Sequence, residues 1–181
     1  MKVYVHLATG FEEIEAVTVI DVLRRAGIDT ESVSVTGDLS VKGAHGITVE
    51  ADLLFDSADY KNCGMIVLPG GMPGTTNLGA HEGLMREIRA FAAQGKYLAA
   101  ICAAPMVFGE AGLLQGKKAV IYPGMEAHLK GALVGKGAVE SDDKIITSKG
   151  PGTAYDFAFA IVETIKGAEA AAVLRKAMIL A

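Results

Sequence analysis

The stretch Y-L-A-A-I-C-A-A-P-M-V-F-G (residues 97–109) places a cysteine where a predicted strand meets a predicted helix. The apolar run 97–101 is typical of a buried strand, and Pro105 suits the first turn of a helix because its missing N–H needs no partner there. Such a turn resembles a nucleophile elbow, and the helix dipole behind it is expected to favour a thiolate. Free cysteine is also among the most buried residue types. Cys102 is therefore either a nucleophile or a structural thiol.

Strand-like runs alternate with helical patterns along the chain. Strands are predicted at 2–8, 30–36, 65–69, 97–101, 118–121, 138–141 and 144–148, with a small hairpin over 41–50. Helices are predicted at 12–26, at 82–94, from Cys102 to about Leu114, at 153–166 and at 168–176. This alternation indicates βαβ units and a mostly parallel sheet covered on both faces. No linker or repeat interrupts it, so we expect residues 1–181 to form a single α/β domain.

The charge balance argues against nucleic-acid and membrane partners. Seventeen Lys and Arg residues face 21 Asp and Glu residues, which gives a formal net charge of −4, and no run of five like charges occurs. No apolar run approaches the roughly 20 residues that span a bilayer. The first residues also lack the pattern of a signal peptide. We therefore expect a cytoplasmic protein in which both cysteines, Cys63 and Cys102, are reduced.

Three segments with unusual residues follow predicted strands. Ligands of open parallel sheets bind beyond the carboxyl ends of the strands, and this rule selects residues 9–15, the loop after Leu68 and the segment after Ile101. The loop L-P-G-G-M-P-G (68–74) lacks the endings of phosphate-binding and dinucleotide-binding motifs. Its backbone N–H groups can still stabilise an anion. The three segments are therefore expected to build one site.

Glu15 lies on the apolar face of the first predicted helix. On a helical wheel it groups with Val19 and Val22, whereas Glu13 falls on the solvent side. Glu12 lies nearer the helix start, where free N–H groups are expected to satisfy it. A carboxylate on a core-facing stripe is unfavourable unless it is protonated or paired, so the position of Glu15 favours a role in chemistry. Near a thiol, its pKa is expected to rise towards neutrality.

The histidines do not suggest a metal site. None of His6, His45, His81 and His128 is paired with a cysteine or carboxylate at metal-ligand spacing along the chain. His6 is expected in the core and His81 at a helix start, where it can act as a cap. Cys63 has no activating neighbour in the sequence. We therefore expect no metal and no cofactor.

Four segments together resemble the ThiJ/PfpI superfamily, closest to the branch of the parkinsonism-associated protein deglycase and its bacterial relatives. They are A-T-G-F-E-E-I-E-A (8–16), V-L-P-G-G (67–71), A-A-I-C-A-A-P (99–105) and T-S-K-G-P-G-T-A (147–154). The resemblance implies a flavodoxin-like three-layer sandwich. It also implies that Cys102 is the nucleophile, that Glu15 is its inward-facing acid, and that Gly71 and Ala103 supply N–H donors for an oxyanion.

The resemblance extends to the surroundings of the pocket. Gly70 in the glycine loop, Tyr122 and His45 are expected to bind the oxyanion or the substrate. Tyr122 stands where the deglycase carries a histidine, and His45 stands where some members place an arginine. A tyrosine is a poor base at neutral pH, so Glu15 would carry more of the proton transfer. Members of the branch are homodimers, which implies the same here, with residues 151–152 (Pro151 and Gly152) close to the partner's pocket.

The implied function is a cofactor-independent enzyme acting on 2-oxoaldehydes, such as methylglyoxal and glyoxal, or on their early adducts. Cys102 would form a hemithioacetal and Glu15 would act as acid and base. The alternative is a redox-sensing stress protein or holdase chaperone with an oxidisable Cys102. An amidase or peptidase is disfavoured, because Ala103 occupies the position of the peptidase histidine and no His-x-Glu pair follows His128.

Overall fold

The computed structural model describes residues 1–180 and is built on a seven-stranded sheet. Its strands are β1 (Lys2–Leu7), β2 (Asp29–Ser34), β5 (Leu53–Leu54), β6 (Cys63–Leu68), β7 (Tyr97–Ile101), β10 (Val139–Asp142) and β11 (Ile145–Ser148). They lie in the order β10-β11-β7-β6-β1-β2-β5, and of these only β10 runs antiparallel to its neighbour. The mostly parallel sheet expected from the alternating pattern is therefore confirmed.

Two small two-stranded sheets lie outside this layer. One is the predicted hairpin, formed by β3 (Ser40–Lys42) and β4 (Thr48–Glu50), which pair antiparallel. The other is a short parallel pair, β8 (Lys118–Ala119) with β9 (Leu133–Val134). Three short 3-10 helices complete the connections: η1 (Phe55–Ser57), η2 (Glu126–His128) and η3 (Pro151–Thr153).

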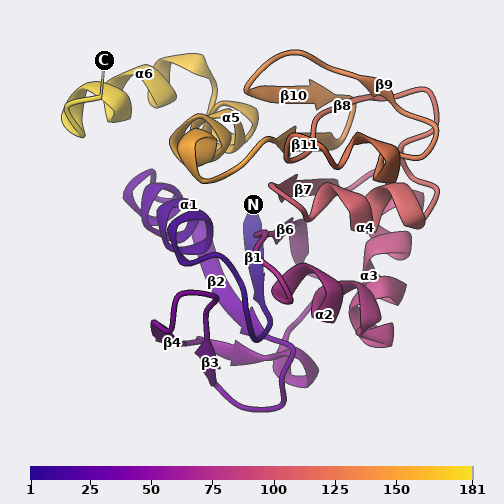
Figure 1. The fold of residues 1–181 in the computed structure, drawn as a ribbon. Helices are drawn as coiled ribbons and strands as arrows, with labels where there is room; N and C mark the ends of the chain where they lie inside the picture. The colour runs from indigo at the N-terminus through magenta and orange to yellow at the C-terminus, as the bar shows by residue number, and fades with distance from the viewer. Residues whose placement is uncertain (181) are drawn as a thin grey trace.

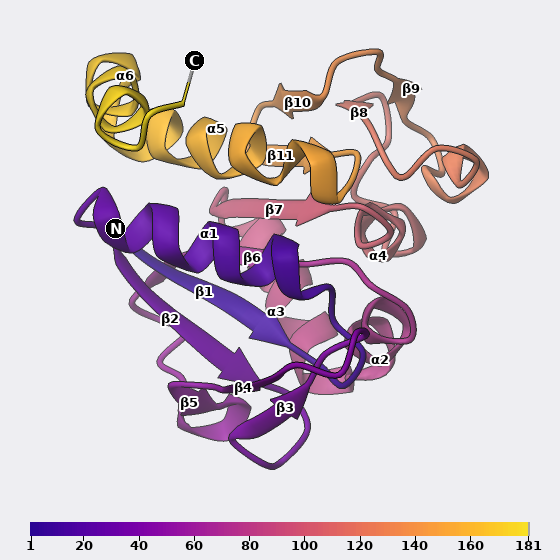
Figure 2. The same ribbon diagram turned by 60° about the vertical axis from the view of Figure 1, so that its left-hand side comes forward.

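Helices cover both faces of the sheet (Figures 1 and 2). On one side lie α1 (Glu13–Arg25) and α5 (Ala154–Lys166), with α6 (Ala168–Ala177) following α5. On the other side lie α2 (Gly74–Ala80), α3 (Glu82–Ala93) and α4 (Pro105–Glu110). This three-layer arrangement is the flavodoxin-like sandwich that the resemblance implied.

Alternation along the strands gives each face its own core. In β1, Val3, Val5 and Leu7 belong to the cluster under α1 and α5, whereas Tyr4 belongs to the cluster under α2, α3 and α4. The same alternation in β6 sends Val67 to the first cluster. Successive side chains of a strand point to opposite faces, so a strand buried on both sides needs apolar residues at nearly every position.

Several boundaries differ from those predicted. Helix α2 was not predicted, because G-T-T-N-L-G-A has two glycines and little apolar periodicity. The helix after Cys102 ends at Glu110 rather than near Leu114, and Gly112 in the turn beyond it has a φ of 74°. The expected strand at 118–121 is reduced to the two residues of β8, and β5 and β9 were missed because each has only two residues.

The topology places the carboxyl ends of β1, β6 and β7 at one edge. The chain adds β2 on one side of β1 and then crosses to add β6 on the other, which makes the β1–β6 boundary the switch point where ligands bind in such sheets. Backbone bonds join the loops there: the Glu12 N–H donates to the Gly70 carbonyl at 2.9 Å, and the Gly74 N–H to the Gly10 carbonyl at 3.1 Å. The predicted convergence of these loops is confirmed.

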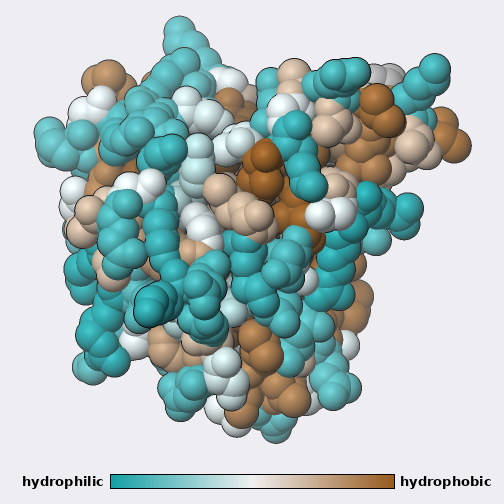
Figure 3. Space-filling view, turned by 180° about the vertical axis from the view of Figure 1, so that it is seen from behind, coloured by the Kyte–Doolittle hydropathy of each residue, from teal (hydrophilic) through white to brown (hydrophobic). Residues whose placement is uncertain are grey.

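The face opposite to the view of Figure 1 is largely polar, with apolar residues in separate patches (Figure 3). Within residues 1–180, no helix combines the length and the apolar character that crossing a membrane requires.

Candidate active site

Cys102 occupies a constrained turn between β7 and α4. Its φ is 63°, in the left-handed region that non-glycine residues rarely adopt, at a cost of roughly 1–3 kcal/mol. Two backbone bonds hold the turn: the Cys102 N–H donates to the Ser148 carbonyl at 3.0 Å, and the Tyr122 N–H donates to the Cys102 carbonyl at 2.8 Å. Pro105 opens α4, as expected. The predicted nucleophile elbow is therefore present.

Glu15 projects from the first turn of α1 into the space beside Cys102. The residue is fully buried, and its Oε2 accepts a hydrogen bond from the Gly70 N–H at 2.7 Å. Its Oε1 is buried and has no partner among residues 1–180 that meets the criteria of a hydrogen bond, although the thiol of Cys102 lies close enough to interact with the carboxyl group. The inward position found on the helical wheel is confirmed.

A side chain at position 70 would separate this pair. A Cβ on Gly70 would lie 2.5 Å from the Cβ of Cys102 and 2.8 Å from Oε2 of Glu15, closer than non-bonded atoms approach. The absence of a side chain at Gly70 therefore lets the backbone that follows β6 approach both groups at once. Gly70, which was expected to bind the oxyanion or the substrate, acts here as a donor to the carboxylate.

Burial dominates the electrostatics of the pair. It raises the pKa of Glu15 to about 7, with the charge of Glu12 adding to this effect and the Gly70 N–H and Cys102 opposing it. Burial also raises the pKa of Cys102, together with the facing charge of Glu15, to about 12. Because the two groups interact this closely, they titrate as a unit, which holds two protons below about pH 7 and one proton above it.

The helix-dipole argument predicted the wrong direction for the thiol. The N–H groups of Gly71 and Ala103 do favour the ionised sulfur, as that argument requires. They are outweighed because Cys102 is only 9% exposed and faces a carboxylate, while α4 has only six residues. The pKa of the Cys102 thiol therefore depends on burial and on the charge of Glu15 more than on the helix.

Tyr122 and the η3 segment are the other residues that the sequence predicted near this centre. Tyr122 is half-exposed and follows Cys102 through the backbone bond described above. Its ring lies against Gly150, where an added Cβ would be 3.3 Å from Cδ2. Pro151 and Gly152 follow Gly150 directly in the chain and form part of η3. Their roles towards a substrate or a second subunit stay predictions.

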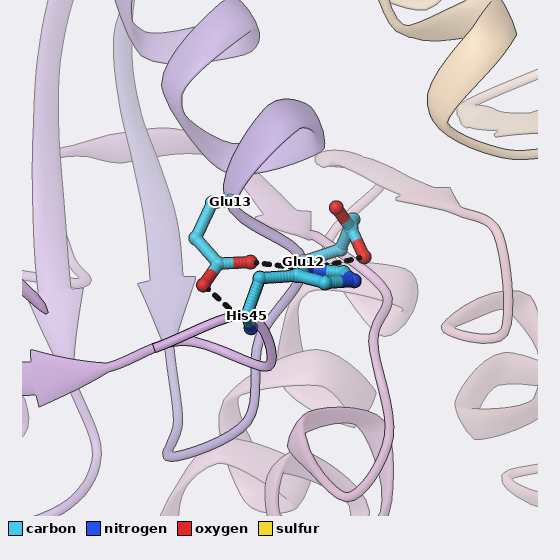
Figure 4. Close-up of side chains that lie close together, drawn as sticks. All are labelled: Glu12, Glu13 and His45. Carbon is cyan, nitrogen blue, oxygen red and sulfur yellow. Dashed lines mark hydrogen bonds and ion pairs between the residues drawn. The ribbon is translucent and has the colours of Figure 1, made fainter. Parts of the chain in front are cut away.

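His45 belongs to a second cluster at the same edge (Figure 4). Its Nδ1 lies 3.0 Å from Oε2 of Glu13 and 3.6 Å from Oε2 of Glu12. Glu13 was expected on the solvent side and is instead buried, because the turn between β3 and β4 covers the first turn of α1. The side chain of Glu12 does not cap the helix either. Sequence spacing gave no sign of this cluster, since His45 is 32 residues from Glu13.

The other expectations for histidine and cysteine are confirmed. His6 is buried, with Nε2 2.8 Å from the Tyr60 hydroxyl. His81 caps α3, where its Nδ1 accepts a hydrogen bond from the Leu84 N–H at 3.0 Å. Cys63 is buried in the core, and burial raises the pKa of its thiol to about 11.

Comparisons with known proteins point to one family. A sequence model of the DJ-1/PfpI family matches residues 1–164. The chain is 35% identical over 177 residues to protein dj-1beta of Drosophila melanogaster, covering 97% of this chain and 95% of that one. It is 33% identical over 172 residues to the glutathione-independent glyoxalase DJR-1.2 of Caenorhabditis elegans, covering 94% and 91%.

The chain spans less than half the length of two Arabidopsis thaliana relatives that it matches. Protein DJ-1 homolog B of Arabidopsis thaliana is 42% identical over 172 residues, which are 94% of this chain and 39% of that protein. Among solved structures, oxidized Toxoplasma gondii DJ-1 superposes with a TM-score of 0.96 at 39% identity, covering 99% of this chain and 98% of that one.

The geometry at position 70 predicts a specific defect. In Gly70→Ala the new methyl group would push Cys102 and Glu15 apart, so we expect the unfolding free energy to fall by about 1–3 kcal/mol and the alkylation rate of Cys102 to change. Gly79→Ala is the matched control, because a Cβ there meets only Val107 at 3.6 Å. Urea unfolding and timed alkylation measure both effects, and a Gly70→Ala protein indistinguishable from wild type would refute the close approach.

Proposed function

The chain belongs to the DJ-1/PfpI family, and from that premise we propose that it is a glutathione-independent glyoxalase that converts 2-oxoaldehydes such as methylglyoxal to 2-hydroxy acids. The observation that carries this proposal is the fully buried Glu15 beside the constrained Cys102. A shared proton between a sulfur nucleophile and a carboxylate is what an internal oxidation–reduction of an aldehyde requires. The name of the Caenorhabditis elegans relative supports the same activity.

The first step is addition of the Cys102 sulfur to the aldehyde carbon. Glu15 relays the proton of the pair to the new oxygen, which yields a hemithioacetal. The N–H groups of Gly71 and Ala103, which favour negative charge at the sulfur, would stabilise the oxyanion as it forms. No thiol cofactor is needed, because Cys102 itself supplies the sulfur that adds to the aldehyde and that water later displaces.

The second step moves a proton between the two substrate carbons. The Glu15 carboxylate removes the C1 hydrogen as a proton and returns it to C2, while the proton of the C1 hydroxyl passes to the C2 oxygen. The hemithioacetal thereby becomes a thioester of a 2-hydroxy acid. Water then hydrolyses the thioester, releasing the acid and the thiol. The sum is one aldehyde plus one water giving one hydroxy acid, with no external oxidant. Early adducts of glyoxals with amines or thiols are a second substrate class that the same steps would accept.

A redox-sensing role for the same thiol is the second candidate, and holdase chaperone activity belongs with it. The observation that favours it is the similarity to a DJ-1 structure described as oxidized. Cys102 is the more exposed of the two cysteines and has a proton-exchanging neighbour, whereas Cys63 is buried without one.

We also propose that two copies associate through α1 and the η3 segment. Ile14 and Val17 on the outer face of α1 and Tyr155 after η3 are exposed apolar side chains, which a second subunit would cover. Pro151 and Gly152 would then approach the partner's pocket, as the family resemblance implies.

The proposed chemistry predicts the loss of activity in two variants. Cys102→Ala removes the nucleophile, and we expect no turnover of methylglyoxal above background. Glu15→Gln removes the proton carrier, and we expect kcat to fall by about 10²- to 10⁴-fold. Cys63→Ala, which changes the other thiol, should keep the wild-type rate. Lactate formation in coupled assays measures all three, and a Cys102→Ala enzyme with wild-type turnover would exclude this mechanism.

The same step has a pH dependence. Glu15 must be ionised to remove the C1 proton, and its pKa is raised to about 7. The rate of the wild-type enzyme should therefore fall by about tenfold per pH unit below that value.

Mild peroxide treatment tests the redox role. Cys102 is expected to be oxidised first, to the sulfenic and then the sulfinic acid, because Cys63 is shielded from solvent. Mass spectrometry of peptides after graded exposure orders the two sites. Oxidation of Cys63 ahead of Cys102 would remove the basis of a sensor function.

A further inference from the structure

We propose that Glu12, Glu13 and His45 form a binding site for one divalent transition-metal ion of the zinc class, at the sheet edge that also carries Glu15. The proposal is independent of the glyoxalase chemistry and departs from the expectation, based on sequence spacing, that the chain holds no metal. It is carried by the spacing of the donor atoms, by the burial of both carboxylates and by the bonds that orient them.

The donor atoms have the spacing of a coordination polyhedron. One donor atom from each of the three residues lies within 4.8 Å of the others. The Nδ1 of His45 is 3.0 Å from Oε2 of Glu13 and 3.6 Å from Oε2 of Glu12. A tetrahedral zinc ion bonded at about 2.0–2.1 Å holds its donors about 3.3 Å apart. The two spacings to His45 lie within about 0.3 Å of that value and the third is within 4.8 Å, so modest side-chain shifts would let an ion fit between these atoms.

The charge of the cluster calls for a cation. Glu12 is 8% exposed and Glu13 is 5% exposed, so both carboxylates are largely removed from water. Within residues 1–180 neither carboxylate forms an ion pair with a lysine or arginine, and His45 is the charge partner of both. Buried carboxylates are stable when they are paired or coordinate a metal. A dication would neutralise both at once, which a single imidazolium does not.

Glu12 gives an observation independent of the spacing. In the part of the chain that the structure describes, its carboxylate accepts no hydrogen bond, and its nearest cationic atom is the Nδ1 of His45 at 3.6 Å. Figure 4 shows this carboxylate turned towards the His45 ring. Both oxygens of this largely buried carboxylate are therefore free of hydrogen-bond donors, and His45 is its one charge partner among residues 1–180.

Glu13 is positioned by backbone bonds that leave one oxygen available. Its Oε1 accepts N–H groups from His45 at 2.8 Å and from Ile47 at 3.3 Å, while Oε2 faces the imidazole. Such outer contacts orient metal ligands in known sites. They also tie the turn between β3 and β4 to α1, so the histidine and the two acids are held together by the fold.

The chemistry of the donors indicates which ion fits. One imidazole and two carboxylates, without a thiolate, suit manganese, cobalt, nickel or zinc, and affinity rises from manganese through cobalt and nickel to copper, with zinc below copper. The His45 side chain is 68% exposed, so an ion can enter from solvent and keep a water molecule as its fourth ligand. With three protein ligands and one open position, such a site would exchange its metal ion with the solvent.

Cobalt binding to the full-length wild-type protein tests the proposal directly, because cobalt occupies zinc sites and is coloured. We expect one cobalt ion per chain, with visible d–d bands of a site made of nitrogen and oxygen, without thiolate-to-cobalt charge transfer. Added zinc should bleach these bands. Glu12→Gln and His45→Ala should each weaken binding by at least about tenfold. Glu12→Gln is isosteric and loses no hydrogen bond, so its fold should be retained.

Two matched variants control for other ligands. The Nδ1 of His128 lies 3.6 Å from a carboxylate oxygen of Glu110, a pair of the same kind without a second buried acid, so His128→Ala should bind cobalt as the wild type does. Cys102→Ala should also bind it, which shows that the thiol is not a ligand. The proposal is overturned if the wild type binds no cobalt, if affinity survives in both Glu12→Gln and His45→Ala, or if it disappears in Cys102→Ala.

Discussion

The contact between the buried carboxyl group of Glu15 and the thiol of Cys102 is the interaction on which the site depends. Two acidic groups removed from water cannot both ionise, because each would lose hydration and face the other's charge. Burial therefore raises the pKa of both groups, and the pair holds a single proton once the pH exceeds about 7. The proposed roles of Cys102 as nucleophile and of Glu15 as acid and base therefore both depend on the unfavourable free energy of ionising two buried groups side by side.

The fold supplies the geometry that this constraint needs. Strands β1, β6 and β7 end at one edge, so α1 delivers Glu15, the glycine loop delivers the N–H of Gly70, and the turn after β7 delivers Cys102. The left-handed φ of Cys102 and the absence of a side chain at Gly70 bring these groups together at the expense of local backbone freedom. Strain at this edge is offset by the two apolar cores that flank the sheet.

Much of this arrangement can be predicted from the sequence, because it depends on patterns among residues that are close together in the chain. Alternating strand and helix patterns predict the layers, the strand-end rule predicts which loops meet, and the wheel position of Glu15 predicts an inward acid. Helix α2 escapes prediction because its glycines hide its periodicity, and the thiol pKa escapes because it depends on the distance to a carboxylate 87 positions earlier in the printed sequence.

The burial of Glu13 shows the limit most clearly. A helical wheel places its side chain towards solvent, and the wheel is correct for the helix taken alone. The β3–β4 turn then covers that face and brings His45 onto it, through contacts between residues more than thirty positions apart. The same folding step creates the Glu12–Glu13–His45 cluster, which no spacing along the chain reveals.

The most direct test of the central claim is a pH titration of the Cys102 thiol, followed by its alkylation rate in the wild type and in Glu15→Gln, both in a Cys63→Ala background. If Glu15 and Cys102 share a proton, the removal of the carboxyl group must displace the midpoint of the thiol titration. Superimposable titration curves for the two proteins would contradict the account, because they would show that Glu15 and Cys102 ionise independently.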